Sequence, residues 1–242
     1  MRAIIRKFMP RFIKQLAKRI LGFLYWDPWF TPSWSQEGED MVLRRIFEKQ
    51  RKGVYVDVGA HHPKRFSNTY FFYKQGWSGI NIDAMPKSMV AFNKKRPRDI
   101  NIESGVGLTH GVMEYYVFNE SALNGFCAEL SKNRNDCNNS YFVKEIVSVD
   151  VLPLGEILDN HLQDTNIDFM SIDVEGLDLE VLKSNDWKKY RPSIVLVEIL
   201  NSSLHELKNN VIVKYMDENG YALYAKQVNT VFFTDIECVS EN

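Results

Sequence analysis

The sequence predicts an α/β fold: a doubly wound, mostly parallel sheet with an antiparallel C-terminal edge, preceded by an N-terminal amphipathic helix. Two observations carry the sheet prediction. Apolar runs of strand length alternate with segments of helix length between residues 54 and 199, as they do when helices cover both faces of a parallel sheet. The last two strand-like runs, 221–225 and 230–233, form a terminal pair that predicts the antiparallel edge.

Length and composition set bounds on the class of protein. A chain of 242 residues fits one domain with an appendage and can bury a substantial core. The net charge of −1 gives no overall field that would favour nucleic acid, so no nucleic-acid partner is expected. The three cysteines form no Cys-x-x-Cys pair, which argues against a disulfide framework and favours a reducing cytoplasm. No apolar run approaches the ~20 residues that span a bilayer.

The first 24 residues carry seven basic side chains and no acid, so residues 25–242 together carry −8. Apolar residues recur there at intervals of three and four, which predicts a basic amphipathic helix with a kink at Pro10. Such a helix is typical of contact with an anionic membrane, here the inner face of the cell membrane. The alternatives are packing on the domain or on a second subunit, and a mitochondrial presequence. Residues 25–34, rich in Trp and Pro, predict a hinge.

Residues 35–242 form the predicted main domain, and its elements follow in order. A helix is expected to begin with Ser35 as N-cap and to end before Gly53. Further helices are expected within 67–76, 86–95, 154–161, 177–182 and 204–219. Strands are expected at 54–58, 80–83, 100–103, 112–118, 145–151, 167–172 and 194–199, before the terminal pair. Residues 119–141, rich in Asn, Ser and Asp, predict an insertion or lid.

Chemistry-bearing residues gather at the predicted carboxyl ends of the strands, where ligands bind in such sheets. Gly59 lets the backbone approach a ligand closely, and Asp83 can accept both hydroxyls of a ribose. The acids Asp57 and Asp173 suit a cationic ligand better than a pyrophosphate. The turn after the first strand lacks Gly-x-Gly-x-x-Gly, and the chain has no phosphate-binding loop. S-adenosylmethionine, with a ribose, an ammonium and a sulfonium but no phosphate, fits this set.

Four segments, in order, strengthen this interpretation: 35–40 (SQEGED), 56–60 (VDVGA), 76–83 (GWSGINID) and 171–176 (SIDVEG). With them the chain resembles the FkbM-type S-adenosylmethionine-dependent methyltransferases, a class I, Rossmann-like family, over residues 35–235. The resemblance departs from the common pattern at Pro63, where a glycine is more usual, and at Asp83, where Glu is more frequent.

The resemblance and the strand-end pattern together predict the site. Cofactor contacts are expected from Gln36, Asp57, Gly59, Ala60, His61, Asp83, Ala84, Ser104, Val106 and Asp173. His61, Asp173 and Glu175 are the expected catalytic residues, with His62 and Glu198 as further candidates for the general base. Each also has a structural interpretation, since the histidines can shape their turn and Glu175 can stabilise a helix N-terminus. No metal ligand is predicted.

Family members commonly O-methylate sugars or other hydroxyls in cell-surface and secondary-metabolite pathways. The expected function is therefore O-methylation of a sugar hydroxyl in a surface glycan, a lipid-linked glycan or a related metabolite. One alternative is a metal-dependent glycosyltransferase that uses Asp173 and Glu175 to hold a nucleotide sugar. Another is a non-catalytic, membrane-tethered binding module on the same fold. The sequence indicates neither the acceptor nor the oligomeric state.

Overall fold

The computed structural model describes residues 29–136, 140–162, 166–200 and 202–239. The chain divides into two units, residues 1–33 and 34–242, and the account below concerns the second. The predicted amphipathic helix at residues 1–24 lies outside the described residues. Among the described helices, none is long and apolar enough to cross a membrane.

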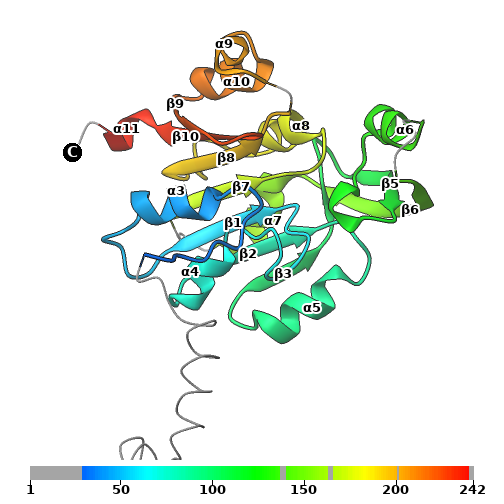
Figure 1. The fold of residues 1–242 in the computed structure, drawn as a ribbon, viewed down its shortest axis with the longest axis horizontal. Helices are drawn as coiled ribbons and strands as arrows, with labels where there is room; N and C mark the ends of the chain where they lie inside the picture. The colour runs from blue at the N-terminus through cyan, green and yellow to red at the C-terminus, as the bar shows by residue number, and fades with distance from the viewer. Residues whose placement is uncertain (1–28, 137–139, 163–165, 201, 240–242) are drawn as a thin grey trace, which may run out of the picture. The chain divides into compact units, whose positions relative to one another are not determined.

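A seven-stranded sheet forms the centre of the domain (Figure 1). Its order is β3-β2-β1-β7-β8-β10-β9. The first five of these strands run parallel, and β10 is antiparallel to both of its neighbours, β8 and β9. The bounds are β1 Val54–Val58, β2 Ser78–Asp83, β3 Ile100–Glu103, β7 Phe169–Ile172, β8 Ile194–Glu198, β9 Tyr221–Lys226 and β10 Thr230–Asp235. The predicted doubly wound, mostly parallel sheet with an antiparallel C-terminal edge is confirmed.

Helices cover both faces of this sheet because the central strands β1, β7 and β8 bury side chains on both sides. The larger core cluster joins β1, β2, β7 and β8 to three helices, α7 (Leu154–His161), α8 (Asp178–Lys183) and α10 (Val211–Glu218). A second, aromatic cluster joins α3 (Glu39–Ile46) and α4 (Tyr70–Lys74) to β1, β7, β8 and β10. Helix α5 (Ser88–Lys95) buries Met89 and Phe92 against Ala60. These contacts fix the turn after β1, on which the site depends.

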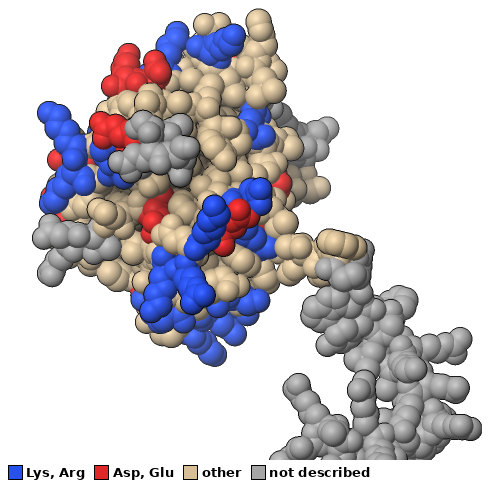
Figure 2. Space-filling view, turned by 90° about the vertical axis from the view of Figure 1, so that its left-hand side faces the viewer, with Lys and Arg blue, Asp and Glu red and all other residues tan. Residues whose placement is uncertain are grey.

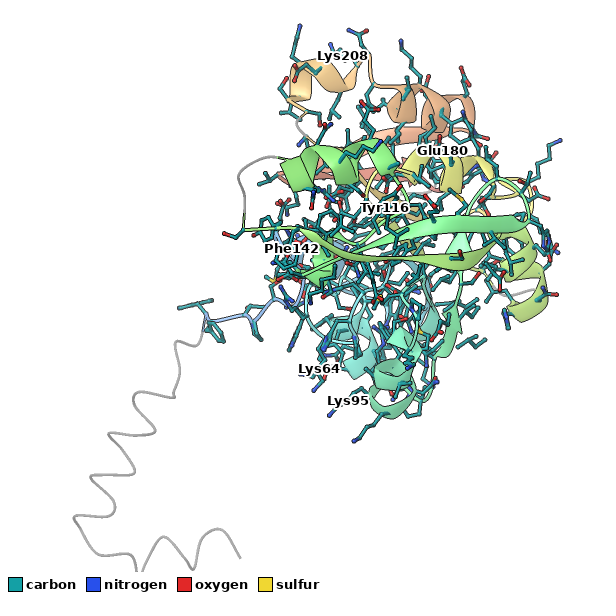
Figure 3. The ribbon with its side chains drawn as sticks, turned by 90° about the vertical axis from the view of Figure 1, so that its right-hand side faces the viewer. Lys64, Lys95, Tyr116, Phe142, Glu180 and Lys208 are labelled. Atoms are coloured by element: carbon teal, nitrogen blue, oxygen red, sulfur yellow. The ribbon has the colours of Figure 1, made fainter. Side chains whose placement is uncertain are left out.

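A smaller sheet of three strands stands beside the central one, in the order β4-β6-β5. Its strands are β4 (Gly105–Val106), β5 (Gly111–Phe118) and β6 (Val143–Leu152), and β5 with β6 forms the antiparallel arm expected from the alternating sequence. Figure 3 shows this arm from the side, with Tyr116 and Phe142 labelled. Between the two strands lie the short 3-10 helix η1 (Ser121–Leu123) and α6 (Ala128–Asp136), within the segment predicted as an insertion or lid.

The helices differ from the expected ones in two places. Helix α3 begins at Glu39, not after Ser35, because Gly38 has a φ of 91°, a left-handed conformation that a helix cannot contain. The hydroxyl of Ser35 instead accepts the backbone N–H of Asp40. The range 204–219, expected to contain one helix, contains α10 and a short helix before it, α9 (Leu204–Leu207). The side chain of Asn210 starts α10 anew by accepting the N–H of Ile212. The last element of the described residues is α11 (Ile236–Val239).

Candidate functional site

A cavity of about 440 Å³ opens at the carboxyl ends of β1, β2, β7 and β8. This is the edge at which a parallel sheet of this kind binds its ligands. Most of the predicted site residues line it: Gln36, Gly59, His61, Asp83, Ala84, Ser104, Val106, Asp173 and Glu175. Residues far apart in the sequence therefore meet in one cavity, as the strand-end interpretation required.

Two predicted cofactor residues do not line the cavity. Asp57 is buried beneath the turn, where its carboxylate accepts the hydroxyl of Thr69 at 2.6 Å. Thr69 in turn accepts N–H groups of the buried Arg96, so Asp57 belongs to an internal polar network. Burial raises the pKa of Asp57, and the Thr69 hydrogen bond opposes that rise. The side chain of Ala60 packs in the core. Both side chains therefore support the turn after β1 from its buried side and do not face the cavity.

Gly59 lines the cavity, but the protein itself already requires a glycine there. Its φ is 81°, and a Cβ at this position would lie 1.8 Å from the backbone oxygen of Asp173. The turn after β1 and the turn after β7 are thus in direct backbone contact, and a side chain would force them apart. From the sequence, we expected a glycine here because a ligand comes close to the backbone. The structure adds a second cause, the approach of the neighbouring strand.

Asp83 ends β2 at the cavity wall, with only 6% of its surface exposed. One carboxylate oxygen accepts the backbone N–H of His61 at 2.7 Å, and the other accepts that of Met85 at 2.9 Å. Burial raises its pKa, while these two backbone donors act in the opposite direction. Each carboxylate oxygen has a second lone pair, so Asp83 can still accept hydroxyl groups of a ligand. This is the chemistry predicted for a ribose contact.

His61 adopts a left-handed conformation, with a φ of 52°, in the turn that follows β1. Its Nε2 lies 2.9 Å from the hydroxyl of Ser121, and its Nδ1 is buried without a partner among the described residues. Burial lowers the pKa of His61, and the neighbouring Arg65 lowers it further. The imidazole is therefore neutral near pH 7 and has one nitrogen able to bind a proton or a ligand group. His62 does not line the cavity; its Nδ1 accepts the N–H groups of Lys64 and Arg65.

Three carboxylates that line the cavity lie close together: those of Asp173, Glu175 and Glu198. One oxygen from each lies within 4.8 Å of the others, a spacing that a divalent cation could bridge. Burial and mutual repulsion raise the pKa of Asp173 well above its ordinary value, although its side chain is accessible from the cavity. The same effects raise the pKa of Glu198 to about 8. This cluster is able to hold a proton, a metal ion or a cationic group, whereas the sequence predicted no metal ligand.

The turn that carries two of these acids is held in a strained shape. Glu175 has a φ of 54°, which costs a side-chain-bearing residue about 1 kcal/mol or more. The carboxylate of Asp178 fixes the turn by accepting the N–H groups of Val174 and Gly176. The carboxylate of Glu175 is paired with Arg134 of α6 at 2.6 Å. Glu175 is therefore bound to a cation of residues 119–141, whereas Asp173 has no hydrogen bond to a side chain within the described residues.

The sequence did not allow us to predict several residues that line the cavity. They are mainly aromatic or come from residues 119–141: Phe66, Tyr115, Glu120, Ser121, Asn124, Phe126, Arg134 and Tyr141. Phe66 has a φ of 55°, an uncommon conformation for a bulky side chain, and no feature of the sequence indicates it. No local signal marks Tyr115 or Phe126. Their position depends on the pairing of β5 with β6, which is a long-range contact.

The charges around the cavity fit a cationic cofactor. Both arginines that line it, Arg65 and Arg134, are paired with glutamates. No lysine lines it, so a phosphate would find no unpaired cation among the lining residues. The buried carboxylate of Asp83 suits a ribose, and Asp173 suits a positively charged group. The residues present therefore fit S-adenosylmethionine, and Gly59, Asp83 and Ser104 are the residues that would hold it.

The chain matches one protein family and is similar to several solved structures. Residues 57–223 match the family model described as the methyltransferase FkbM domain. No curated protein matches the chain. One similar solved structure is a TehB-like SAM-dependent methyltransferase from Corynebacterium glutamicum, which is 10% identical over 92% of this chain and 96% of that one, with a TM-score of 0.41. Another is a precorrin-6y C5,15-methyltransferase from Geobacter metallireducens, 13% identical over 86% and 93%, with a TM-score of 0.42.

The family match alone spans more than half of the chain, and it includes the turn after β1, Asp83 at the end of β2 and the acidic turn after β7. The protein belongs to the FkbM family of methyltransferases, and its cofactor is S-adenosylmethionine.

Proposed function

We propose that the protein transfers the methyl group of S-adenosylmethionine to a hydroxyl of a sugar, in a surface glycan, a lipid-linked glycan or a related metabolite. The observation that carries this proposal is the cluster of Asp173, Glu175 and Glu198, which faces the same cavity as Asp83 and Gly59. Carboxylates accept hydrogen bonds in pairs, so an acceptor with several neighbouring hydroxyls suits this wall. Phe66 and Tyr141 add apolar surface against which a sugar ring can pack.

The bound cofactor supplies an activated methyl group, so the protein must mainly align the acceptor oxygen with it. Such alignment contributes about 7–11 kcal/mol, and a general base adds roughly 10²–10⁴-fold in rate. His61, Asp173 and Glu175 are the proposed catalytic residues. Among them, Glu175 is paired with Arg134, and His61 is neutral with its Nδ1 unpartnered among the described residues. The deprotonated carboxylate of Asp173 is therefore the base best placed to take the proton from the acceptor hydroxyl. Its raised pKa makes it a stronger base than an ordinary aspartate.

We also propose that the enzyme acts at a membrane. Residues 1–24, with a net charge of +7, would hold the enzyme at the cytoplasmic face of the cell membrane, where lipid-linked acceptors are available. Vesicle flotation of the whole chain, compared with a chain lacking residues 1–24, tests this part. Equal flotation of both would rule out the tether.

The transfer itself is tested with S-adenosylmethionine that carries an isotopically labelled methyl group. The purified protein is incubated with a panel of free sugars, nucleotide sugars and lipid-linked sugars, and the product is located by NMR. We expect the label on a sugar oxygen, and an Asp173→Asn variant that transfers the methyl group poorly even when it is saturated with cofactor. Label on nitrogen would contradict O-methylation. Cofactor that is bound but never consumed across the panel would indicate a non-catalytic binding module.

The metal-dependent glycosyltransferase is the second candidate, because the three clustered carboxylates could hold a cation. Such an enzyme must also hold a diphosphate, and the cavity has no unpaired basic side chain among its lining residues to do so. Calorimetry with a nucleoside diphosphate and manganese separates the two candidates. Manganese-dependent binding of the nucleotide would favour the glycosyltransferase.

A further inference from the structure

The charges of the domain are strongly segregated along the chain. Residues 58–98 contain eight basic side chains and a single acid, the buried Asp83. Residues 99–242 contain ten basic and 24 acidic side chains, a net charge of −14. A solvated surface normally mixes the two signs, so this division calls for a partner of negative charge. Residues 58–98 form β1's turn, α4, β2, α5 and the loop that follows it.

Five exposed cations of this segment form one surface, here called the basic face: Lys64, Lys74, Lys94, Lys95 and Arg98. Figure 2 shows Lys and Arg side chains gathered at the lower end of the molecule, where Figure 1 places α4 and α5. Figure 3 shows Lys64 and Lys95 at that same end. None of the five has an ion pair with a described carboxylate, so their charge is not neutralised within that part of the protein.

Two tyrosines connect the cations of the basic face. The ammonium group of Lys64 lies 5.3 Å from the ring of Tyr70, which stacks on Tyr73 at 6.5 Å. The guanidinium group of Arg98 lies 3.9 Å from the ring of Tyr73 and bonds the backbone of α4. The row from Lys64 to Arg98 is therefore continuous, and it joins the turn after β1 to the end of α5.

We propose that this basic face docks on an anionic membrane surface. Tyrosine beside lysine and arginine is typical of residues at a lipid–water interface. Helix α5 also exposes an apolar residue, Val90, on the surface that bears Lys94. A single-stranded nucleic acid would instead need free aromatic rings for its bases, whereas Tyr70 and Tyr73 already stack on each other, and each has a cation beside its ring.

The docking has a consequence for the acceptor, and that consequence rests on the proposed function. Lys64 is followed directly by Arg65 and Phe66, which line the cavity. A membrane held at the basic face would thus lie next to the loop that borders the cavity. This arrangement suits an acceptor sugar carried on a lipid, presented from the bilayer. The docking itself is measured without any turnover, so it stands or falls independently of the reaction.

The test uses the full chain with its seven basic residues in 1–24 changed to Gln, which removes their charge. Binding is measured by co-sedimentation with phosphatidylcholine vesicles, with and without phosphatidylserine. We expect binding only where phosphatidylserine is present. In this background, Lys64→Gln, Lys94→Gln and Lys95→Gln together should lower the partition constant about 100-fold, since each cation near an anionic surface contributes about tenfold or less.

The matched control changes three exposed lysines outside the basic face, Lys188, Lys208 and Lys214, to Gln. Figure 3 shows Lys208 at the end of the molecule opposite Lys64 and Lys95. The control should bind vesicles as the background protein does, and both triple variants should keep its unfolding temperature. Equal losses in the two variants, or no preference for phosphatidylserine, would overturn the proposal. So would tighter binding to single-stranded oligonucleotides than to vesicles, which would indicate a nucleic-acid surface.

Discussion

The carboxylate of Asp83 accepts the backbone N–H of His61 at 2.7 Å, so the acid at the end of β2 fixes the turn at the end of β1. These are the two predicted functional positions of the β-α-β unit on which the domain is built. The hydrogen bond explains why Asp83, the acid expected to bind a ribose, and His61, a candidate base, lie in one cavity. It also means that a change at Asp83 affects both the binding of the cofactor and the orientation of His61.

Changing Asp83 to Asn should weaken S-adenosylmethionine binding. Hydrogen bonds to a charged acceptor contribute about 1.5–3 kcal/mol, so the dissociation constant should rise roughly 10- to 100-fold. The amide can also accept only through one oxygen, which leaves the N–H of His61 or of Met85 without its partner. Isothermal titration calorimetry measures the effect, with the exposed Asp150→Asn as control. An unchanged affinity would exclude Asp83 from the cofactor site.

Changing Gly59 to Ala should destabilise the fold itself. The new Cβ would lie 1.8 Å from the backbone oxygen of Asp173, and a φ of 81° adds about 1–2 kcal/mol for any other residue. We expect a much lower unfolding temperature, measured by calorimetry without ligand. Gly111→Ala is the matched control, because nothing lies within 4 Å of its Cβ position. A stable Gly59→Ala protein that fails to bind cofactor would show that the ligand alone requires this glycine.

The sequence and the structure agree best where the signal is local. Short segments rich in apolar residues identified β1, β2, β7 and β8, and the residues that follow these strands had to share one edge of the sheet. The direction in which a side chain points was harder to infer. Asp57 precedes Gly59 in the motif, yet it faces Thr69 and Arg96, because a strand alternates its side chains and the burial of Arg96 is a long-range event. The acid cluster gains Glu198 only through the pairing of β7 with β8.

Changing Thr69 to Val should destabilise the protein by about 1–3 kcal/mol, because it removes the hydrogen bond of the buried Asp57 carboxylate. That bond lowers a pKa which burial raises, so its loss moves the pKa of Asp57 further up. A raised folded-state pKa means that stability falls as pH rises above the unfolded value. The deficit of Thr69→Val should thus be small near pH 4 and larger near pH 7.

Urea denaturation at the two pH values measures this deficit. The exposed Thr109→Val makes the same chemical change and should leave the free energy of unfolding within about 0.5 kcal/mol of the wild type. A deficit of Thr69→Val that is equal at both pH values would mean that Asp57 stays protonated in the fold throughout. The buried network of Asp57, Thr69 and Arg96 would then support the turn after β1 through packing, and not through the charge of Asp57.

The acid cluster should make methyl transfer depend on pH. Glu198 has a pKa raised to about 8, and its charge helps to hold the proton on Asp173. If Asp173 takes the proton from the acceptor, kcat should rise with pH until the cluster has lost its protons. Glu198→Gln removes one negative charge from the cluster, lowers the pKa of Asp173 and so should shift that rise to lower pH.

The same substitution changes stability in a related way. Because the folded state holds a proton on Glu198 that the unfolded state releases near pH 4.3, wild-type stability should fall as pH rises from about 4 to about 8. Glu198→Gln should flatten this fall, which unfolding temperatures recorded across that range will show. Glu145→Gln, at an exposed position on β6 outside the cavity, should change neither profile. If the dependence of kcat on pH is the same in Glu198→Gln as in the wild type, Glu198 does not influence the proton transfer. His61 would then be the next base to test.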